Sequence, residues 1–372
     1  MVLTKLGSVI EQSITVNSEG VYTFNDVKGM TIDKEVIPTK AKVKNTDLSK
    51  FLIVNPNEFI YNPRTHGKKI GLGFNQTDKP FIISWNNIAF KVKELDRVNP
   101  TYLFMYFNRN EWDRKAVFDS WGSSTEVFSW KALCDMEIDL PPLYIQEKYV
   151  AIYKAMLANQ KTYENGLEDL KLVCDATIEK IRREMPSERI GNHILRQNER
   201  NEHELNKNVL GLSTKKEFRK PSSKVNKSKL ANYKVVEENW FAYVPTTDTW
   251  KVFAFGLNKG NGQIIVSPIY EVFSIADNSK LKPEYLSMWF KREEFDRFVR
   301  FNSWGSAREN FSFSDLEEVQ IPIPDIKIQQ SIVDIYNAYI TRKQINERLK
   351  QQIKDICPIL IAGAIKEANA NA

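Results

Sequence analysis

The chain has 372 residues, 42% of them hydrophobic and 27% charged, and carries a formal net charge of +6. That length suffices for two or three domains with their own cores. The longest apolar run, residues 357–365, is shorter than the roughly 20 residues of a membrane span. The first residues lack the basic start and apolar centre of a secretory signal, and the three scattered cysteines form no disulfide framework or zinc motif. We therefore expect a cytoplasmic protein, whose mildly basic charge permits an anionic partner such as nucleic acid without requiring one.

The first 140 or so residues combine short strand-like runs with a helix. The runs "FLIV" (51–54) and "PFIISW" (80–85) are rich in β-branched and aromatic residues and are bounded by Asn, Gly and Pro clusters, as is typical of strands. Residues 100–118 then place apolar side chains at helical spacing. We predict a globular α/β or α+β domain.

A long helix is predicted to follow. Residues 143–185 contain no proline and one glycine, and their apolar residues recur at steps of three or four, apart from a break around Gln160. About 40 helical residues make a rod of roughly 60 Å. Because its apolar seam is narrow, such a rod requires a coiled-coil partner.

The second half of the chain repeats the first. At an offset of 183, residues 100–155 align without a gap to residues 283–338, and 26 of the 56 pairs are identical. The tetrapeptide "SWGS" stands at 120–123 and again at 303–306. Weaker similarity extends upstream, so the chain is predicted to be a duplication of a domain-sized unit, residues 1–187 and 188–372, and not a solenoid.

The second copy also ends in a predicted long helix, in which Pro358 is expected to kink or end the helix. The helix of the other copy is the obvious partner for each rod. Two separate helical packings, one in each domain, are the alternative.

No sequence motif points to catalysis or metal binding. The chain has no phosphate-binding loop of the GxxxxGK[ST] type, and its three histidines are too scattered for a metal cluster. We therefore expect neither an enzyme nor a cofactor site on this chain.

Polar loops at corresponding places in the two copies suit binding better. They are residues 62–69 and 75–79 in the first copy, and 246–251 and 258–263 in the second. Arg, Lys, Asn and Gln are the side chains that read base edges and phosphates. Ordinary polar surface loops are the alternative. The candidate DNA-binding residues are Arg64, His66, Lys68, Lys69, Asn75, Gln76, Trp250, Lys251, Asn258, Lys259, the Asn261–Gly262 pair and Arg308.

The "SWGS" repeat is predicted to be a turn. Gly122 and Gly305 permit a tight turn, and Trp121 and Trp304 are expected to be packed or half-packed beside it. The alternative is a turn that faces DNA, with Arg308 at a phosphate.

The whole layout resembles the specificity (S) subunits of type I restriction-modification systems. The resemblance covers essentially the full chain and rests on the duplicated order of a variable domain, the "SWGS" turn, and a proline-containing turn that leads into a long helix. The second copy carries these as "SWGSAREN" (303–310) and "IPIPDIKIQQSIV" (321–333), and the first as "SWGSSTEVFSWKAL" (120–133) and "IDLPPLYIQEKYV" (138–150). The first copy departs with Thr125 against Arg308 and Pro142 against Asp325, which affects local contacts only.

The resemblance implies an α+β fold with two tandem target recognition domains, residues 1–142 and 188–325. Residues 143–187 and 326–372 would be two long antiparallel, coiled-coil-like spacer helices. Each recognition domain would read one half of a split double-stranded DNA target. Two methyltransferase (M) subunits using S-adenosylmethionine and restriction (R) subunits using ATP and Mg²⁺ would supply the chemistry, so that the chain itself would be non-catalytic. A stand-alone tandem DNA-binding regulator and an enzyme with an unrecognised site are the other classes to be tested.

Overall fold

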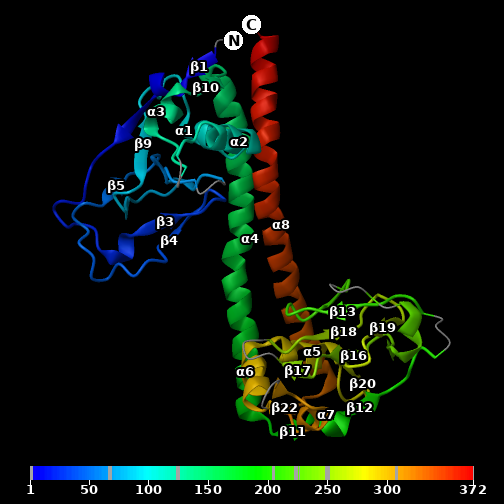
Figure 1. Ribbon diagram of the computed structural model, residues 1–372. Helices are drawn as coiled ribbons and strands as arrows, with labels where there is room; N and C mark the ends of the chain where they lie inside the picture. The colour runs from blue at the N-terminus through cyan, green and yellow to red at the C-terminus, as the bar shows by residue number, and fades with distance from the viewer. Residues whose placement is uncertain are drawn as a thin grey trace. The chain divides into compact units, whose positions relative to one another are not determined.

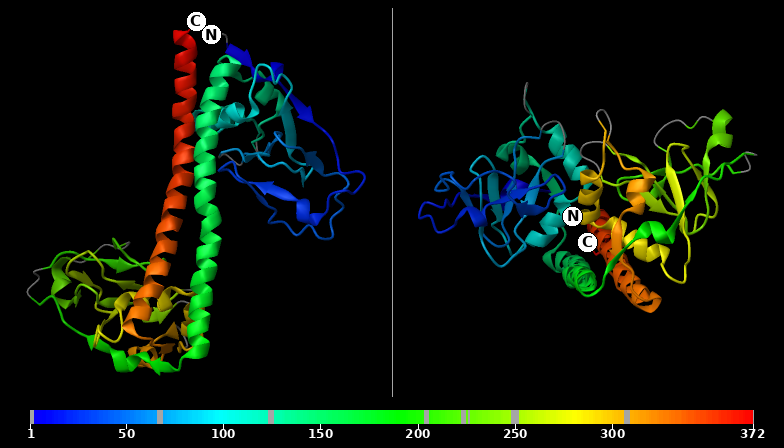
Figure 2. Two further views of the ribbon diagram at one scale, coloured as in Figure 1. Left: turned by 180° about the vertical axis from the view of Figure 1, so that it is seen from behind. Right: turned by 90° about the horizontal axis from the view of Figure 1, so that it is seen from below.

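The computed structural model describes residues 3–371 except 66–68, 123–125, 203–205, 222–224, 226, 248–251 and 306–308. The chain forms two compact units (Figures 1 and 2). Unit 1 combines residues 1–163 with 345–372, and unit 2 comprises residues 164–344. Each unit therefore contains one mixed domain and a part of each of two long helices.

Unit 1 is built on a four-stranded antiparallel sheet with the strand order β2-β9-β6-β7. Three antiparallel strand pairs, β1-β10, β3-β4 and β5-β8, surround it. The strands are β1 (Leu3–Lys5), β2 (Ile10–Ser13), β3 (Lys28–Met30), β4 (Val36–Pro38), β5 (Leu52–Val54), β6 (Phe59–Tyr61), β7 (Leu72–Phe74), β8 (Phe81–Ile83), β9 (Ile88–Val92) and β10 (Glu137–Asp139). The helices are η1 (Leu6–Ser8), η2 (Phe24–Asp26), α1 (Pro100–Phe107), α2 (Asn110–Phe118) and α3 (Trp130–Asp135).

Two helices of unit 1, α1 and α3, begin where the sequence supplies a cap. The Asn99 side chain accepts hydrogen bonds from the backbone N–H groups of Thr101 and Tyr102, and Pro100 occupies the first helical position, where its missing N–H costs nothing. Ser129 caps α3 in the same way. These caps fix where α1 begins after the sheet and where α3 begins after the "SWGS" segment.

The core of unit 1 is aromatic. Phe59 of the sheet stacks on Phe74 and Phe90 with ring centroids 4.5 and 4.9 Å apart, and Phe107 of α1 meets Phe59 edge-on. Burial of these rings drives α1 onto the sheet. The opposite side of α1, through Tyr102 and Met105, packs against the long helices.

Unit 2 repeats this topology. Its central sheet has the order β12-β20-β16-β18, matching β2-β9-β6-β7 in chain order, with antiparallel pairs β11-β22, β13-β14, β15-β19 and β17-β21. The strands are β11 (Ser187–Arg189), β12 (Ile194–Gln197), β13 (Gly211–Leu212), β14 (Phe218–Arg219), β15 (Lys234–Val236), β16 (Phe241–Tyr243), β17 (Thr246–Thr247), β18 (Phe255–Leu257), β19 (Ile264–Val266), β20 (Glu271–Ile275), β21 (Glu309–Asn310) and β22 (Gln320–Pro322). The helices are η3 (Ile190–His193), η4 (Lys227–Asn232), α5 (Pro283–Lys291), α6 (Glu293–Phe301) and α7 (Phe313–Glu317).

Backbone details confirm the duplication. Lys34 and Asn57 adopt positive φ angles of 63° and 65°, and their counterparts Lys216 and Asn239 have φ angles of 62° and 65°. Left-handed backbone is unusual for residues other than glycine. Its occurrence at equivalent turns shows that both copies keep the same loop geometry, and the antiparallel sheets place each domain in the α+β class.

The two long helices are α4 (Leu143–Glu184) and α8 (Ile326–Ala370). Both begin at the residues where the sequence predicts their starts. In unit 1 they run antiparallel, because early residues of α4 contact late residues of α8: Lys148 lies 2.8 Å from Glu367, and the buried amides of Gln160 and Asn346 are 2.8 Å apart. The prediction that each helix is the partner of the other is confirmed for this unit.

The contact between Gln160 and Asn346 explains the break in the apolar seam. A lone buried amide in such a seam is unfavourable, whereas two facing amides bond to each other.

Unit 2 uses the remaining parts of the same helices. Ile178 and Ile181 of α4 join Ile332 and Val333 of α8 in one core cluster with α5. Each mixed domain therefore completes its core against both helices.

Pro358 was predicted to end or kink the second helix, and the predicted end is wrong. The helix continues to Ala370. Proline removes only one backbone hydrogen bond, and apolar packing of the surrounding turn compensates for that loss, because Cys357, Leu360 and Ile361 are buried against α1 and α4.

Candidate DNA-recognition surface

The "SWGS" repeat forms the same hairpin in both units. Trp121 and Val127 exchange two backbone hydrogen bonds of 3.2 and 3.0 Å, as Trp304 and Asn310 do with 3.1 and 2.9 Å. The glycines that follow have φ angles of 155° (Gly122) and 150° (Gly305). Such angles favour glycine, so the predicted turn is confirmed.

The serine that opens each motif fixes the hairpin to the preceding helix. The Ser120 hydroxyl donates to the Ala116 carbonyl at the end of α2, and the Ser303 hydroxyl donates to the Val299 carbonyl at the end of α6. The tryptophan that comes next in each copy is therefore held at a defined position beside the helix end.

The expectation that the two tryptophans are packed or half-packed is wrong. Trp121 is 82% exposed and Trp304 is 72% exposed. The buried aromatic residues of this segment are instead Phe128 and Phe311, seven residues further on, whose N–H groups donate to the carbonyls of Pro63 and Pro245. The tryptophans were expected to be packed or half-packed beside the turn because large aromatic residues are mostly buried.

The hairpins bind to the predicted loops. In unit 1, Val127 bridges to Arg64 on the side opposite Trp121. In unit 2, Asn310 pairs with Thr246 of β17 on the side opposite Trp304. Arg64 and Thr246, which belong to one of the two predicted loops in their respective copies, therefore lie beside an exposed tryptophan.

The described candidate residues divide into exposed and buried groups. Arg64, Gln76 and Asn261 are exposed. Lys69 and Lys259 keep side-chain exposures of 48% and 54%, although Lys259 is 2.6 Å from Glu284 and Lys69 is 3.8 Å from Asp113. Gly262, beside Asn261, has a φ of 61° and shapes the turn.

Asn75 and Asn258 hold their loops together from inside. The Asn75 amide donates to the carbonyls of Val54 and Lys79, and the Asn258 amide donates to three carbonyls, including that of Gly262 at 2.8 Å. Both side chains are almost fully buried. Their donors are thus used within the turn, and we leave both residues out of the proposed DNA surface.

The remaining candidates lie outside the described residues, and for them the interpretation stays a prediction. They are His66, Lys68, Trp250, Lys251 and Arg308.

A buried ion pair that sequence reasoning missed lies beneath the candidate DNA-recognition surface. The ammonium of Lys34 lies 2.7 and 2.9 Å from the two carboxylate oxygens of Asp113. In unit 2 the ammonium of Lys216 lies 2.8 Å from Asp296. Burial acts to lower the pKa of Lys34 and to raise the pKa of Asp113, while their mutual attraction opposes both shifts.

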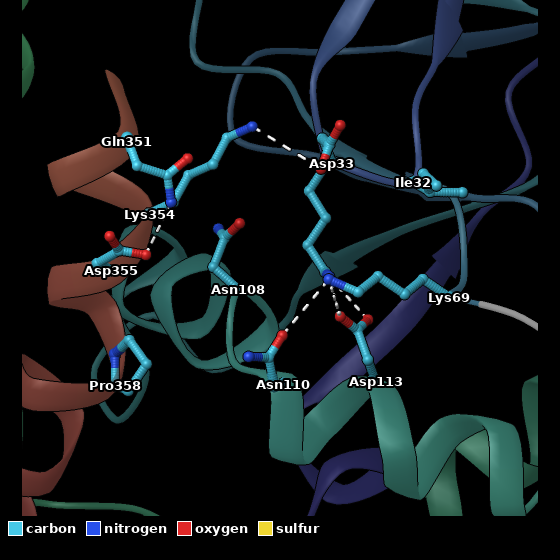
Figure 3. A pocket seen from close by; sticks show the side chains of 11 residues that line it. Ile32, Asp33, Lys69, Asn108, Asn110, Asp113, Gln351, Lys354, Asp355 and Pro358 are labelled. Atoms are coloured by element: carbon cyan, nitrogen blue, oxygen red, sulfur yellow. Dashed lines mark hydrogen bonds and ion pairs between the residues drawn. The ribbon is translucent and has the colours of Figure 1, made fainter. Parts of the chain in front are cut away.

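The unit 1 pair lines a polar cleft of about 450 Å³ between the domain and α8 (Figure 3). Lys354 of α8 reaches across it to Asp33 at 3.8 Å and to Glu35 at 3.5 Å. Because cations and carboxylates alternate around the cleft, it is suited to holding the β3–β4 turn against α8 and not to binding an anion.

A second missed feature docks each domain on its long helix. The side chain of Gln146 accepts from the N–H of Asn99 at 2.9 Å and donates to the carbonyls of Arg97 and Pro141. Gln329 makes the same three contacts with Lys282, Lys280 and Pro324. The signal in the sequence was the glutamine shared by both helix starts.

The described part of the chain has neither a metal-binding cluster nor a membrane-spanning helix. No three His, Cys, Asp or Glu side chains there are placed to hold a metal ion, and no described helix has both the length and the apolar character of a membrane span.

Comparison with known proteins connects this duplicated fold with DNA specificity. Residues 260–355 match the family model described as "Type I restriction modification DNA specificity domain". The matched segment runs from the polar loop of unit 2 through the "SWGS" hairpin and into α8. Over these residues the second copy is therefore similar to a DNA specificity domain.

Over nearly its full length the chain has a fold similar to that of a solved S subunit. The chain is similar to the type I restriction-modification S subunit from M. genitalium, with a TM-score of 0.58 and 11% identity over 99% of this chain and 95% of that chain. Together the two matches confirm the resemblance to type I specificity subunits. No curated protein matches the chain in sequence.

Two further structures align over nearly the full length of the chain, with TM-scores below 0.5. The HsdS subunit from Thermoanaerobacter tengcongensis has a TM-score of 0.39 and 14% identity over 98% of this chain and 96% of that chain. A structure described under "complex assembly and conformational transition of the type I R-M system" has a TM-score of 0.46 and 13% identity over 97% of both chains.

Proposed function

We propose that this chain is the DNA sequence-recognition subunit of a type I restriction-modification complex. The observation that carries the proposal is the family match over residues 260–355, combined with a first copy of the same topology. Because both copies present an exposed loop and hairpin, each domain reads one half of a bipartite double-stranded DNA target. The polar loops supply the base contacts, and exposed lysines and arginines supply the phosphate contacts.

We further propose that the chain is a cytoplasmic scaffold without catalysis of its own. Two methyltransferase subunits using S-adenosylmethionine and restriction subunits using ATP and Mg²⁺ would assemble on it. The long helices α4 and α8, which contribute to both units, are suited to this role, because the number of residues along them would set the unread spacer between the half-sites.

Domain exchange tests the recognition function. Replacing residues 1–140 with the corresponding domain of another S subunit should change one half of the methylated sequence, as read by methylation sequencing of the host genome. A change in both halves would contradict the modular reading. An adenine methyltransferase gene beside this gene would support the assignment independently.

Helix insertion tests the spacer. Adding two helical turns, about seven residues, to both helices near residues 163 and 345 should lengthen the unread spacer and leave both half-sites intact. An unchanged spacer would show that the helices do not act as a ruler.

The two alternatives predict different behaviour of the isolated chain. A stand-alone regulator would bind one sequence tightly without partner subunits, and an enzyme would show turnover on DNA alone. The proposed scaffold should show neither full specificity nor turnover until the methyltransferase is added.

A further inference from the structure

Four exposed aromatic side chains stand at matching positions of the two copies, and the function described so far does not use them. We call them the tip aromatics. Phe118 is the last residue of α2 and Trp121 follows that helix; Phe301 and Trp304 take the same places at the end of α6, at an offset of 183 residues. Their exposures are 80% and 82% in the first copy and 83% and 72% in the second. Exposed Phe and Trp are costly in water, so their occurrence at the same places in both copies requires an explanation.

The backbone around the tip aromatics presents them outward. The hairpin bonds, the serine contact to the helix end and the glycine turn fix each tryptophan without covering its ring. The phenylalanine lies one helical turn before it, and in unit 1 the Lys115 ammonium sits 5.8 Å from the Phe118 ring.

Pairing across the hairpin sets a row of side chains on one face. Arg64, Val127 and Trp121 pair across neighbouring backbone segments, and directly paired residues direct their side chains to the same face. The exposed side chains of Arg64 and Trp121 therefore lie on the same face, on either side of the half-exposed Val127. A cation beside an aromatic ring is the combination that binds phosphates and nucleic-acid π-faces together.

The surroundings favour DNA over a protein partner. A stable protein interface covers about 800 Å² on each side and has an apolar centre. Here the apolar surface consists of the tip aromatics with the partly exposed Val127 and Phe298. The sequence neighbours of the tip aromatics, Asp119, Ser120, Arg300 and Asn302, are polar. The tip aromatics occur in both copies, whereas the loops beside them differ in sequence. Side chains that are the same at two different half-sites do not distinguish the bases, which argues against a role in reading sequence.

We propose that the tip aromatics contact double-stranded DNA independently of its sequence, in the same way at each half-site. The proposal rests on the proposed function, since it assigns a shared anchoring contact to the surface that reads DNA. Aromatic contact to a base step or sugar adds affinity without a hydrogen-bond code, and the adjacent loops add the sequence preference.

The test uses the full-length chain, alone and assembled with its methyltransferase, and a labelled duplex of arbitrary sequence. In fluorescence anisotropy, Trp121→Ala and Trp304→Ala should each weaken binding roughly tenfold, and Trp→Phe at either position should restore most of it. The slope of log K against log salt should stay unchanged in these variants, because no charge is removed. Arg64→Ala should instead reduce that slope by about one.

Trp85→Ala is the matched control, because Trp85 is also exposed, at 66%, and has no tryptophan counterpart in the second copy. It should bind DNA like the parent chain. Equal affinity of the parent and the Trp121→Ala/Trp304→Ala double variant would overturn the proposal and leave the recognition function intact. Lost assembly with the methyltransferase at unchanged DNA affinity would reassign the surface to a protein. A parent complex that binds no duplex DNA would overturn both the proposed function and this contact.

Discussion

The ammonium of Lys34 and the carboxylate of Asp113 form a buried ion pair in which nitrogen and oxygen are 2.7 Å apart. Lys34 occupies the left-handed position of the β3–β4 turn, and Asp113 lies in the first turn of α2, where the N-terminal helix dipole also favours a carboxylate. The pair therefore ties a surface hairpin to the helix that precedes one of the exposed tryptophans. Lys216 and Asp296 repeat the relationship in unit 2, where Asp296 also accepts from the N–H of Phe253.

Breaking the first pair on one side should be costly. Asp113→Ala leaves the Lys34 ammonium buried and unpaired, and we expect it to destabilise unit 1 by about 3 kcal/mol or more. The double variant Lys34→Met/Asp113→Leu should recover most of that loss, because no buried charge remains. Urea denaturation followed by circular dichroism measures both.

The exposed pair of Lys115 and Asp119, on the same helix, provides the control. Lys115→Ala should change the free energy of unfolding by less than about 1 kcal/mol, because surface ion pairs contribute little. If Asp113→Ala were equally mild, the buried pair would not hold the hairpin.

The two glutamines at the starts of the long helices should each hold one domain in place. Gln146→Ala removes three hydrogen bonds and leaves the N–H of Asn99 without its acceptor, so we expect a loss of about 2–3 kcal/mol. Gln329→Ala should cost a similar amount in unit 2. Limited proteolysis would show the change directly, as faster cleavage near residues 97–99 or 280–282.

Gln330 is a neighbouring residue of the same type whose amide bonds only to Asp334, one turn along the exposed face. Gln330→Ala should alter the free energy of unfolding by no more than about 0.5 kcal/mol. Equal effects of Gln329→Ala and Gln330→Ala would contradict the docking role of the buried glutamine.

Much of this architecture could be predicted from the sequence, because it follows from local and repeating residue patterns. The repeat offset, the long helices from Leu143 and Ile326, and the turn at Gly122 all follow from local patterns. The partner of Gln160 could not be predicted in the same way. The break in the apolar seam was visible, but its explanation, the facing amide of Asn346, lies 186 positions away.

The surface was harder to predict for physical reasons. Asn75 has the composition of an exposed loop, yet its amide satisfies carbonyls inside the turn, and composition does not show which way a side chain points. Trp121 was expected to be packed or half-packed beside the turn, because tryptophan is largely buried on average. Lys34 and Asp113 are 79 positions apart, and single charged residues carry no signal of a buried partner.

The pH dependence of the helix pair should centre on Glu367 of α8. Hydrogen bonds from Lys148 and Tyr149 hold the pKa of Glu367 below its usual 4.5, and the same contact raises the pKa of Lys148 above 10.5. A carboxylate with a lowered pKa stabilises the fold above its unfolded pKa, and that contribution is lost as the pH falls through the folded value. The lysine contribution is present below about 10.5 and is lost at higher pH.

We therefore expect the interaction to be complete at neutral pH and to weaken below about pH 4.5. Glu367→Gln should remove this part of the acid dependence in thermal melts recorded between pH 3 and pH 7, and the difference from the parent chain should vanish at the acid end. A difference that is constant over the whole range would rule out titration of Glu367 as the cause.

The amide pair between Gln160 and Asn346 should set the register of α4 against α8 in unit 1. Both side chains are buried, so Asn346→Leu leaves the Gln160 amide without a partner and should cost about 1–3 kcal/mol. The double variant Gln160→Leu/Asn346→Leu replaces both amides by apolar groups and should be as stable as the parent, or more so. A buried polar pair of this kind fixes register at the expense of stability. The double variant should therefore show a second set of cross-links when cysteines are placed on facing turns of the two helices. A single unchanged cross-link in the double variant would mean that the apolar contacts alone determine the register.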